Sequence, residues 1–117
     1  MRYALIVDDD ISCREIFGHY MGKMGYKSVY AHDGQSALDT LRTAKVDIIL
    51  LDLEMKGMNG LELIVALKNG PQWLVPIIVL SGNTLMLEEA IHMVPAALTK
   101  PIRYAALEPV VRRLMGP

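Results

Sequence analysis

Short apolar runs alternate with stretches of helical hydrophobic periodicity along the whole chain, and this alternation constrains the fold more than any other feature. Mostly apolar runs typical of buried strands occupy residues 3–7, 28–31, 46–51, 76–80 and 97–99. Helical patterns are predicted at about residues 11–24, 34–43, 61–67, 85–93 and 104–115. Five strands that alternate with five helices predict an α/β fold with a central parallel sheet and right-handed crossovers.

Several residues mark where these helices begin and end. Asp33 is a predicted N-cap, and Gly25 is a predicted stop after the first helix. The sequence Asn69-Gly70-Pro71 is expected to terminate the third helix. Pro95 interrupts the segment before the fifth strand, so the fourth helix is expected to be short or irregular.

Length, composition and charge limit the classes of protein to consider. The 117 residues, 52 % of them hydrophobic, predict one domain over residues 1–117, with no linker, repeat or output domain. A net charge of −1 disfavours direct nucleic-acid binding, and no apolar run is long enough to span a membrane. Cys13 is the only cysteine and no signal-peptide core follows Met1, which together indicate a cytoplasmic protein.

Polar residues follow four of the predicted strands. The first strand ends on Asp8-Asp9-Asp10, the third on Asp52, the fourth on Ser81-Gly82 and the fifth on Lys100-Pro101. Ligands of open parallel sheets bind outside the carboxyl ends of the strands. We therefore expect carboxylates, a hydroxyl and an ammonium group to meet at one rim of the sheet.

That set of groups suits phosphoryl chemistry beside a metal ion. Crowded carboxylates repel one another, and a hard divalent cation with oxygen ligands relieves the repulsion; few protein ligands favour Mg²⁺ over Ca²⁺. A carboxylate beside such a cation can act as a nucleophile and form an acyl phosphate. A lysine and a hydroxyl can then neutralise and hydrogen-bond the phosphoryl oxygens.

These motifs, in this order, resemble the receiver domain of two-component response regulators (CheY-like), over essentially the whole chain. The resemblance implies a flavodoxin-like, doubly wound (β/α)5 fold with strand order 2-1-3-4-5. It also implies a role for each matching residue: Asp52 as phosphoacceptor, Asp9 as direct Mg²⁺ ligand, Asp8 as the neighbouring acid, Glu54 as a metal ligand through its backbone carbonyl, Ser81 and Lys100 as contacts of the phosphoryl group, Gly82 as room for the phosphodonor, and Pro101 after a cis peptide bond.

The implied function is a switch in a phosphorelay rather than an enzyme with an external substrate. A histidine kinase or a histidine phosphotransfer protein would donate the phosphoryl group, and the phosphorylated domain would change its contacts with an unknown downstream protein. The domain would be a monomer or a phosphorylation-dependent dimer. Self-phosphorylation and self-dephosphorylation, both dependent on Mg²⁺, would be its only catalysis.

Two other functions fit parts of the sequence. Asp8-Asp9-Asp10-Ile11-Ser12 resembles the nucleophile motif of haloacid-dehalogenase-type phosphatases, in which Asp8 would be phosphorylated. Those enzymes need a late acidic pair, however, and the only acidic residue after Lys100 is Glu108. A receiver-like binding module that is never phosphorylated is the third possibility, although the complete acid, hydroxyl and lysine set disfavours it.

The chain departs from the family pattern at positions close to the predicted site. Lys56 stands where a proline is usual, and Asn59 stands where an aspartate is frequent. Ala97 stands where an aromatic residue usually turns inward on phosphorylation. The activated state is therefore expected to be signalled by displacement of the fourth helix, or by Tyr104, instead of by that aromatic side chain.

Overall fold

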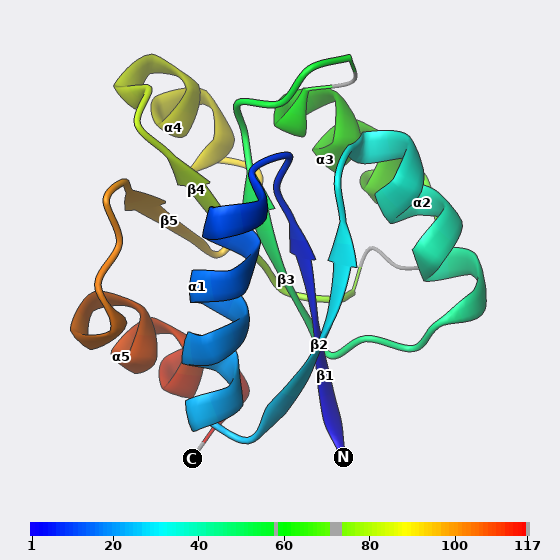
Figure 1. The fold of residues 1–117 in the computed structure, drawn as a ribbon. Coiled ribbons are helices and arrows are strands. Elements are labelled where there is room, and N and C mark those ends of the chain that lie inside the picture. The colour runs from blue at the N-terminus through cyan, green and yellow to red at the C-terminus, as the bar shows by residue number, and fades with distance from the viewer. Residues whose placement is uncertain (58, 71–73, 117) are drawn as a thin grey trace.

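The computed structural model describes residues 1–57, 59–70 and 74–116. A parallel sheet of five strands in the order β2-β1-β3-β4-β5 carries helices on both faces (Figure 1). The strands are β1 (Arg2–Val7), β2 (Tyr26–Ala31), β3 (Ile48–Asp52), β4 (Ile77–Ser81) and β5 (Ala96–Thr99), and the helices are α1 (Ile11–Lys23), α2 (Gly34–Thr43), α3 (Gly60–Lys68), α4 (Thr84–Ala90) and α5 (Tyr104–Met115). The predicted fold class and strand order are confirmed.

Alternate residues of each strand enter two separate hydrophobic cores. Leu5 and Val7 of β1 belong to the core beneath α2, α3 and α4. Ala4 and Ile6 belong to the core beneath α1 and α5. The central strands are therefore buried on both faces, which explains why their sequences are continuous apolar runs without polar alternation.

The helix boundaries follow the predicted capping residues. Gly25 has a φ of 90°, a left-handed conformation that favours glycine, and the chain turns there into β2. The Asp33 carboxylate accepts a hydrogen bond of 2.7 Å from the amide of Ser36, as an N-cap should. Helix α4 ends at Ala90, before the predicted boundary, so it is short as expected. Pro71, part of the predicted terminator of α3, lies outside the described residues. None of the described helices is long and apolar enough to cross a membrane.

Gly60 lies at a close approach between the start of α3 and the end of β3, and this contact gives a testable prediction. A Cβ added at Gly60 would lie 2.6 Å from the Cα atom of Leu53, which is backbone and cannot rotate away. We expect Gly60→Ala to lower the free energy of unfolding by about 2 kcal/mol, the usual cost of overpacking a core. Urea unfolding followed by circular dichroism measures the change.

Gly22→Ala is the matched control, because a Cβ on this helical glycine of α1 would meet nothing within 4 Å. It should raise the free energy of unfolding by about 0.5–1 kcal/mol, since alanine has the higher helix propensity. Equal effects from the two substitutions would contradict the predicted steric role of Gly60.

Candidate functional site

The carboxyl ends of four adjacent strands bring the predicted polar residues to one rim of the sheet. Asp8 follows β1, Asp52 ends β3, Ser81 ends β4 and Lys100 follows β5. Asp8, Asp52 and Ser81 are the buried polar or charged side chains among the described residues, each at most 4 % exposed. Polar groups are rarely buried unless they are paired, so their concentration here marks the rim as a functional site.

Three carboxylates of this rim form a cluster with the spacing of a metal site. Asp8, Asp9 and Asp52 each offer an oxygen atom, and these atoms lie within 4.8 Å of one another. Backbone amides fix two of the three carboxylates: the amide of Asp10 donates to Asp8 over 2.9 Å, and the amide of Glu54 donates to Asp52 over 3.1 Å. An all-oxygen cluster with negative charge suits a hard divalent cation such as Mg²⁺.

Asp10 has a different task from its two neighbours. Its side chain accepts hydrogen bonds from the amides of Ser12 and Cys13, at 2.8 and 3.2 Å, and so caps the start of α1. The three consecutive aspartates thus divide into two members of the acidic cluster and one helix cap.

The Lys100 ammonium group reaches both buried carboxylates. Its Nζ atom lies 3.2 Å from Oδ2 of Asp8 and 3.5 Å from Oδ1 of Asp52. Burial raises the pKa of Asp52 from 3.8 to about 6, although the Glu54 amide and Lys100 oppose the rise. Partial burial would lower the pKa of Lys100, but Asp52 and Asp8 outweigh it and raise that pKa. Lys100 therefore stays a cation, and it lies beside the Asp52 carboxyl, whose ionisation burial disfavours.

The hydroxyl of Ser81 has a partner that the sequence did not predict. It donates a hydrogen bond of 2.6 Å to Oε1 of Glu54, and the amide of Gly82 donates to the same oxygen over 2.9 Å. These bonds, first of all that from Ser81, lower the pKa of the Glu54 carboxyl. From sequence, only the backbone carbonyl of Glu54 was assigned to the site; its place two residues after Asp52 gave no sign of the side chain's direction.

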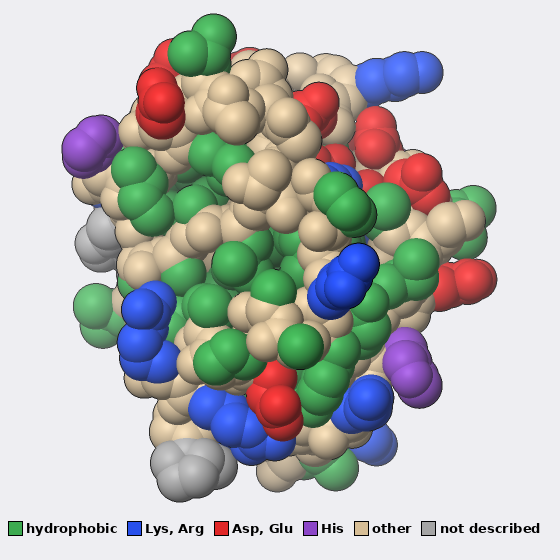
Figure 2. Space-filling model, turned by 90° about the vertical axis from the view of Figure 1, so that its left-hand side faces the viewer, with side chains coloured by type: hydrophobic (Ala, Val, Ile, Leu, Met, Phe, Trp, Pro, Cys, Tyr) green, Lys and Arg blue, Asp and Glu red, His purple; other side chains and the backbone are tan. Residues whose placement is uncertain are grey.

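The face formed by α4, β5 and α5 contains Ala97, the departure from the family pattern that bears on how phosphorylation is signalled. Ala97 is half-buried on β5, and Tyr104 at the start of α5 packs its ring on Tyr20, 5.6 Å between centroids. The Tyr104 hydroxyl donates to Glu108 over 3.1 Å. Figure 2 shows hydrophobic side chains gathered over the middle of this face. Leu85 of α4 is 70 % exposed on the described surface.

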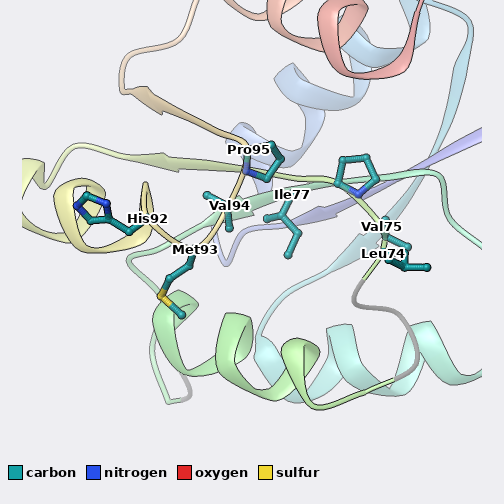
Figure 3. A pocket seen from close by; sticks show the side chains of 8 residues that line it. Leu74, Val75, Ile77, His92, Met93, Val94 and Pro95 are labelled. Carbon is teal, nitrogen blue, oxygen red and sulfur yellow. The ribbon is translucent and has the colours of Figure 1, made fainter.

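A cavity of about 460 Å³ lies away from the acidic rim (Figure 3). It opens where the chain enters β4 and β5, and its lining comes from residues 74–77 and 92–95, whereas Ser81 lies at the opposite end of β4. The lining is mainly apolar, and His92 is the one titratable side chain among its described residues. These are Leu74, Val75, Pro76, Ile77, His92, Met93, Val94 and Pro95. The cavity does not contribute to the site at the rim.

The fold and the rim together define a class of protein. A doubly wound α/β domain that carries a buried aspartate, two further carboxylates, a hydroxyl and a lysine at the carboxyl ends of its strands is typical of signalling domains that accept a phosphoryl group. Comparison with known proteins gives the family. The sequence profile of the response regulator receiver domain matches residues 4–112, so the chain belongs to that family and is a receiver domain of two-component systems.

Individual relatives agree with this assignment. The transcriptional regulatory protein CpxR of Escherichia coli K12 is 30 % identical over 118 residues, which cover 98 % of this chain and 50 % of CpxR. The structure of the chemotaxis protein CheY4 of Vibrio cholerae matches with a TM-score of 0.89 and 30 % identity, over 98 % of this chain and 99 % of CheY4. TrrA of Thermotoga maritima, solved in complex with Mg²⁺ and BeF, matches with a TM-score of 0.89 and 25 % identity, over 98 % and 100 % of the two chains.

The relatives differ in how much of their own length they share with this chain. The chain spans only about half of the curated transcriptional regulators that it matches over most of its residues, 57 % of one and 50 % of another. The shared part is the receiver domain, and the remainder of those regulators has no counterpart in the 117 residues.

Proposed function

We propose that Asp52 accepts a phosphoryl group from a histidine kinase or a histidine phosphotransfer protein, in a reaction that requires Mg²⁺. The observation that carries this proposal is the buried Asp52 carboxylate, 4 % exposed, clustered with Asp8 and Asp9 and 3.5 Å from the Lys100 ammonium group. An Asp52 oxygen would attack the phosphorus of the donor, so that an O–P bond forms as the N–P bond to histidine breaks. The histidine nitrogen keeps the electron pair of that bond and takes up a proton.

The other residues of the rim would bind the Mg²⁺ ion and the phosphoryl group beside Asp52. Asp8, Asp9, Asp52 and the backbone carbonyl of Glu54 would hold the Mg²⁺ ion, whose charge neutralises the carboxylates and the phosphoryl oxygens. The oxygen atoms of the three carboxylates, within 4.8 Å of one another, fit such an ion. Lys100 and Ser81 would then neutralise and hydrogen-bond the phosphoryl oxygens.

The consequence of phosphorylation would be a changed protein-protein contact. Displacement of α4 would carry the signal, because Ala97 has no ring to turn inward and the Tyr104 hydroxyl is already bound to Glu108. The apolar face of α4, β5 and α5 would be the surface that changes (Figure 2). A shift of this kind requires two states that differ by no more than a few kcal/mol and a phosphoryl group that interacts more favourably with one of them.

We further propose that residues 1–117 form one receiver domain, which is a monomer or a phosphorylation-dependent dimer. This domain would act by binding a downstream protein and not by binding DNA. The net charge of −1 supports a protein partner over a nucleic acid, since nucleic-acid binding relies on a basic surface. The single cysteine, which can form no intramolecular disulfide, supports a cytoplasmic location.

Titration with Mg²⁺ and beryllofluoride, a phosphoryl analogue, tests the proposal by NMR of backbone amides. In the native protein, we expect Mg²⁺-dependent shifts for residues around Asp52 and for residues 85–104. Asp52→Asn should show no beryllofluoride response, because the amide cannot supply the anionic oxygen that holds the analogue.

The outcomes separate the proposal from the other functions. A native protein that does not respond would be a binding module that is never phosphorylated. Label from a ³²P phosphodonor found on Asp8 instead of Asp52 would indicate phosphatase chemistry. Shifts confined to resonances near Asp52, with those of residues 85–104 unchanged, would refute the displacement of α4 but leave phosphorylation of Asp52 standing.

A further inference from the structure

The Glu54 side chain occupies the hydrogen-bond donors that a phosphoryl group on Asp52 would need. Its Oε1 atom accepts from the Ser81 hydroxyl at 2.6 Å and from the Gly82 amide at 2.9 Å. Two residues earlier, Asp52 accepts a hydrogen bond from the backbone amide of Glu54 itself. One short segment therefore carries both the nucleophile of the proposed reaction and an anion seated on Ser81.

The donors have no spare capacity while Glu54 is in place. A hydroxyl has one proton to donate, and the proton of Ser81 is directed to Glu54. The Ser81 oxygen in turn accepts a hydrogen bond of 2.8 Å from the Asn83 amide, which fixes the orientation of the hydroxyl. The Gly82 amide likewise has a single proton. A phosphoryl oxygen can use these donors only after Glu54 has left them.

We propose that the Glu54 carboxylate is an internal anion that competes with the phosphoryl group for Ser81 and Gly82, and so restrains phosphorylation of the domain. This inference rests on the proposed function of Asp52. The restraint is displaceable, because Glu54 is an exposed residue on a loop and its side chain can rotate into solvent.

Two substitutions at Glu54 separate its charge from its hydrogen-bonding oxygen. Glu54→Ala removes both, and Glu54→Gln keeps an oxygen acceptor without the negative charge. Glu15→Gln is the matched control, since it removes an exposed carboxylate from α1 without touching Ser81 or the α4 helix. The affinity for beryllofluoride at saturating Mg²⁺ and the rate of phosphorylation by acetyl phosphate are the two measurements.

We expect Glu54→Ala to bind beryllofluoride at least about tenfold more tightly than the native protein, which corresponds to about 1.4 kcal/mol. The affinity of Glu54→Gln should lie between those of the native protein and Glu54→Ala, and Glu15→Gln should match the native protein within about twofold. Phosphorylation by acetyl phosphate should accelerate in the same order. Even without beryllofluoride, the Gly82 amide resonance should move in Glu54→Ala, because its acceptor is gone.

Failure of this inference is distinguishable from failure of the proposed function. If the native protein binds beryllofluoride at Asp52 and Glu54→Ala binds it equally or more weakly, the competition is refuted and the function stands. If neither protein responds to beryllofluoride, the function fails, and the inference fails with it.

Discussion

Asp52→Asn is expected to raise the free energy of unfolding by about 3 kcal/mol at pH 7 when Mg²⁺ is removed with EDTA. The folded protein raises the pKa of Asp52 from 3.8 to about 6, first because the carboxyl is buried. Above pH 6, the native protein must therefore hold an ionised carboxylate in a place that favours the protonated acid. Asparagine has nearly the same shape and carries no charge, so the substitution removes this cost.

The pH dependence of the difference follows from the same shift. An acid with a raised pKa binds its proton more tightly in the folded state, so the folded state is favoured by protonation. Below about pH 4 the carboxyl is protonated in both states, and Asp52→Asn should gain little. The advantage of the substitution should grow as the pH rises from about 4 to about 6 and stay constant above that range.

Chemical denaturation at pH 4, 5, 6 and 7 measures this profile, with Asp39→Asn as the control. Asp39 lies on α2 with 58 % of its side chain exposed, and its substitution should change the free energy of unfolding by less than about 0.5 kcal/mol. Saturating Mg²⁺ should reduce the advantage of Asp52→Asn, because a cation stabilises the carboxylate. A variant no more stable than the native protein at pH 7 in EDTA would contradict the cost assigned to Asp52.

The fold could be predicted from the sequence because its central strands are buried on both faces. Ile48, Ile49 and Leu50 are fully buried in β3, and only an apolar side chain is tolerated at each. The polar residue that ends such a run is conspicuous, and for this reason the sequence alone assigns Asp52 and Ser81 to the rim. Caps such as Asp33 were predictable as well, since the geometry of an N-cap is local.

Contacts between segments far apart in the chain could not be predicted in this way. Glu54 and Ser81 are separated by 27 residues, and nothing in either local sequence states that the carboxylate turns toward the hydroxyl. The boundaries of the short elements depend on tertiary packing for the same reason. Strand β2 begins at Tyr26, two residues before the predicted strand, because Tyr26 pairs with Arg2 of β1.

Lys100→Met should change the affinities for the cation and for the phosphoryl analogue in opposite directions. The Nζ atom lies 3.2 Å from Asp8 and 3.5 Å from Asp52, so its charge repels a metal ion at this cluster and attracts an anion. We expect Mg²⁺ to bind about tenfold more tightly, which corresponds to about 1.4 kcal/mol. This is about a third of the roughly 4 kcal/mol by which two unit charges 4 Å apart interact near a protein surface. Beryllofluoride should bind about 100-fold more weakly, in line with the loss of a hydrogen bond between charged groups.

Isothermal titration calorimetry with Mg²⁺, followed by beryllofluoride at saturating Mg²⁺, measures both affinities. Lys27→Met is the control, because Lys27 is exposed on β2, the strand at the edge of the sheet beyond β1, and its loss should leave both affinities within about twofold of native. Methionine keeps the apolar stem of Lys100, which retains the packing beside Phe17, whose ring centroid lies 6.0 Å from Nζ. General damage to the rim would weaken both ligands together, whereas loss of a positive charge must strengthen one and weaken the other. Parallel weakening would therefore refute Lys100 as the counter-charge of the site.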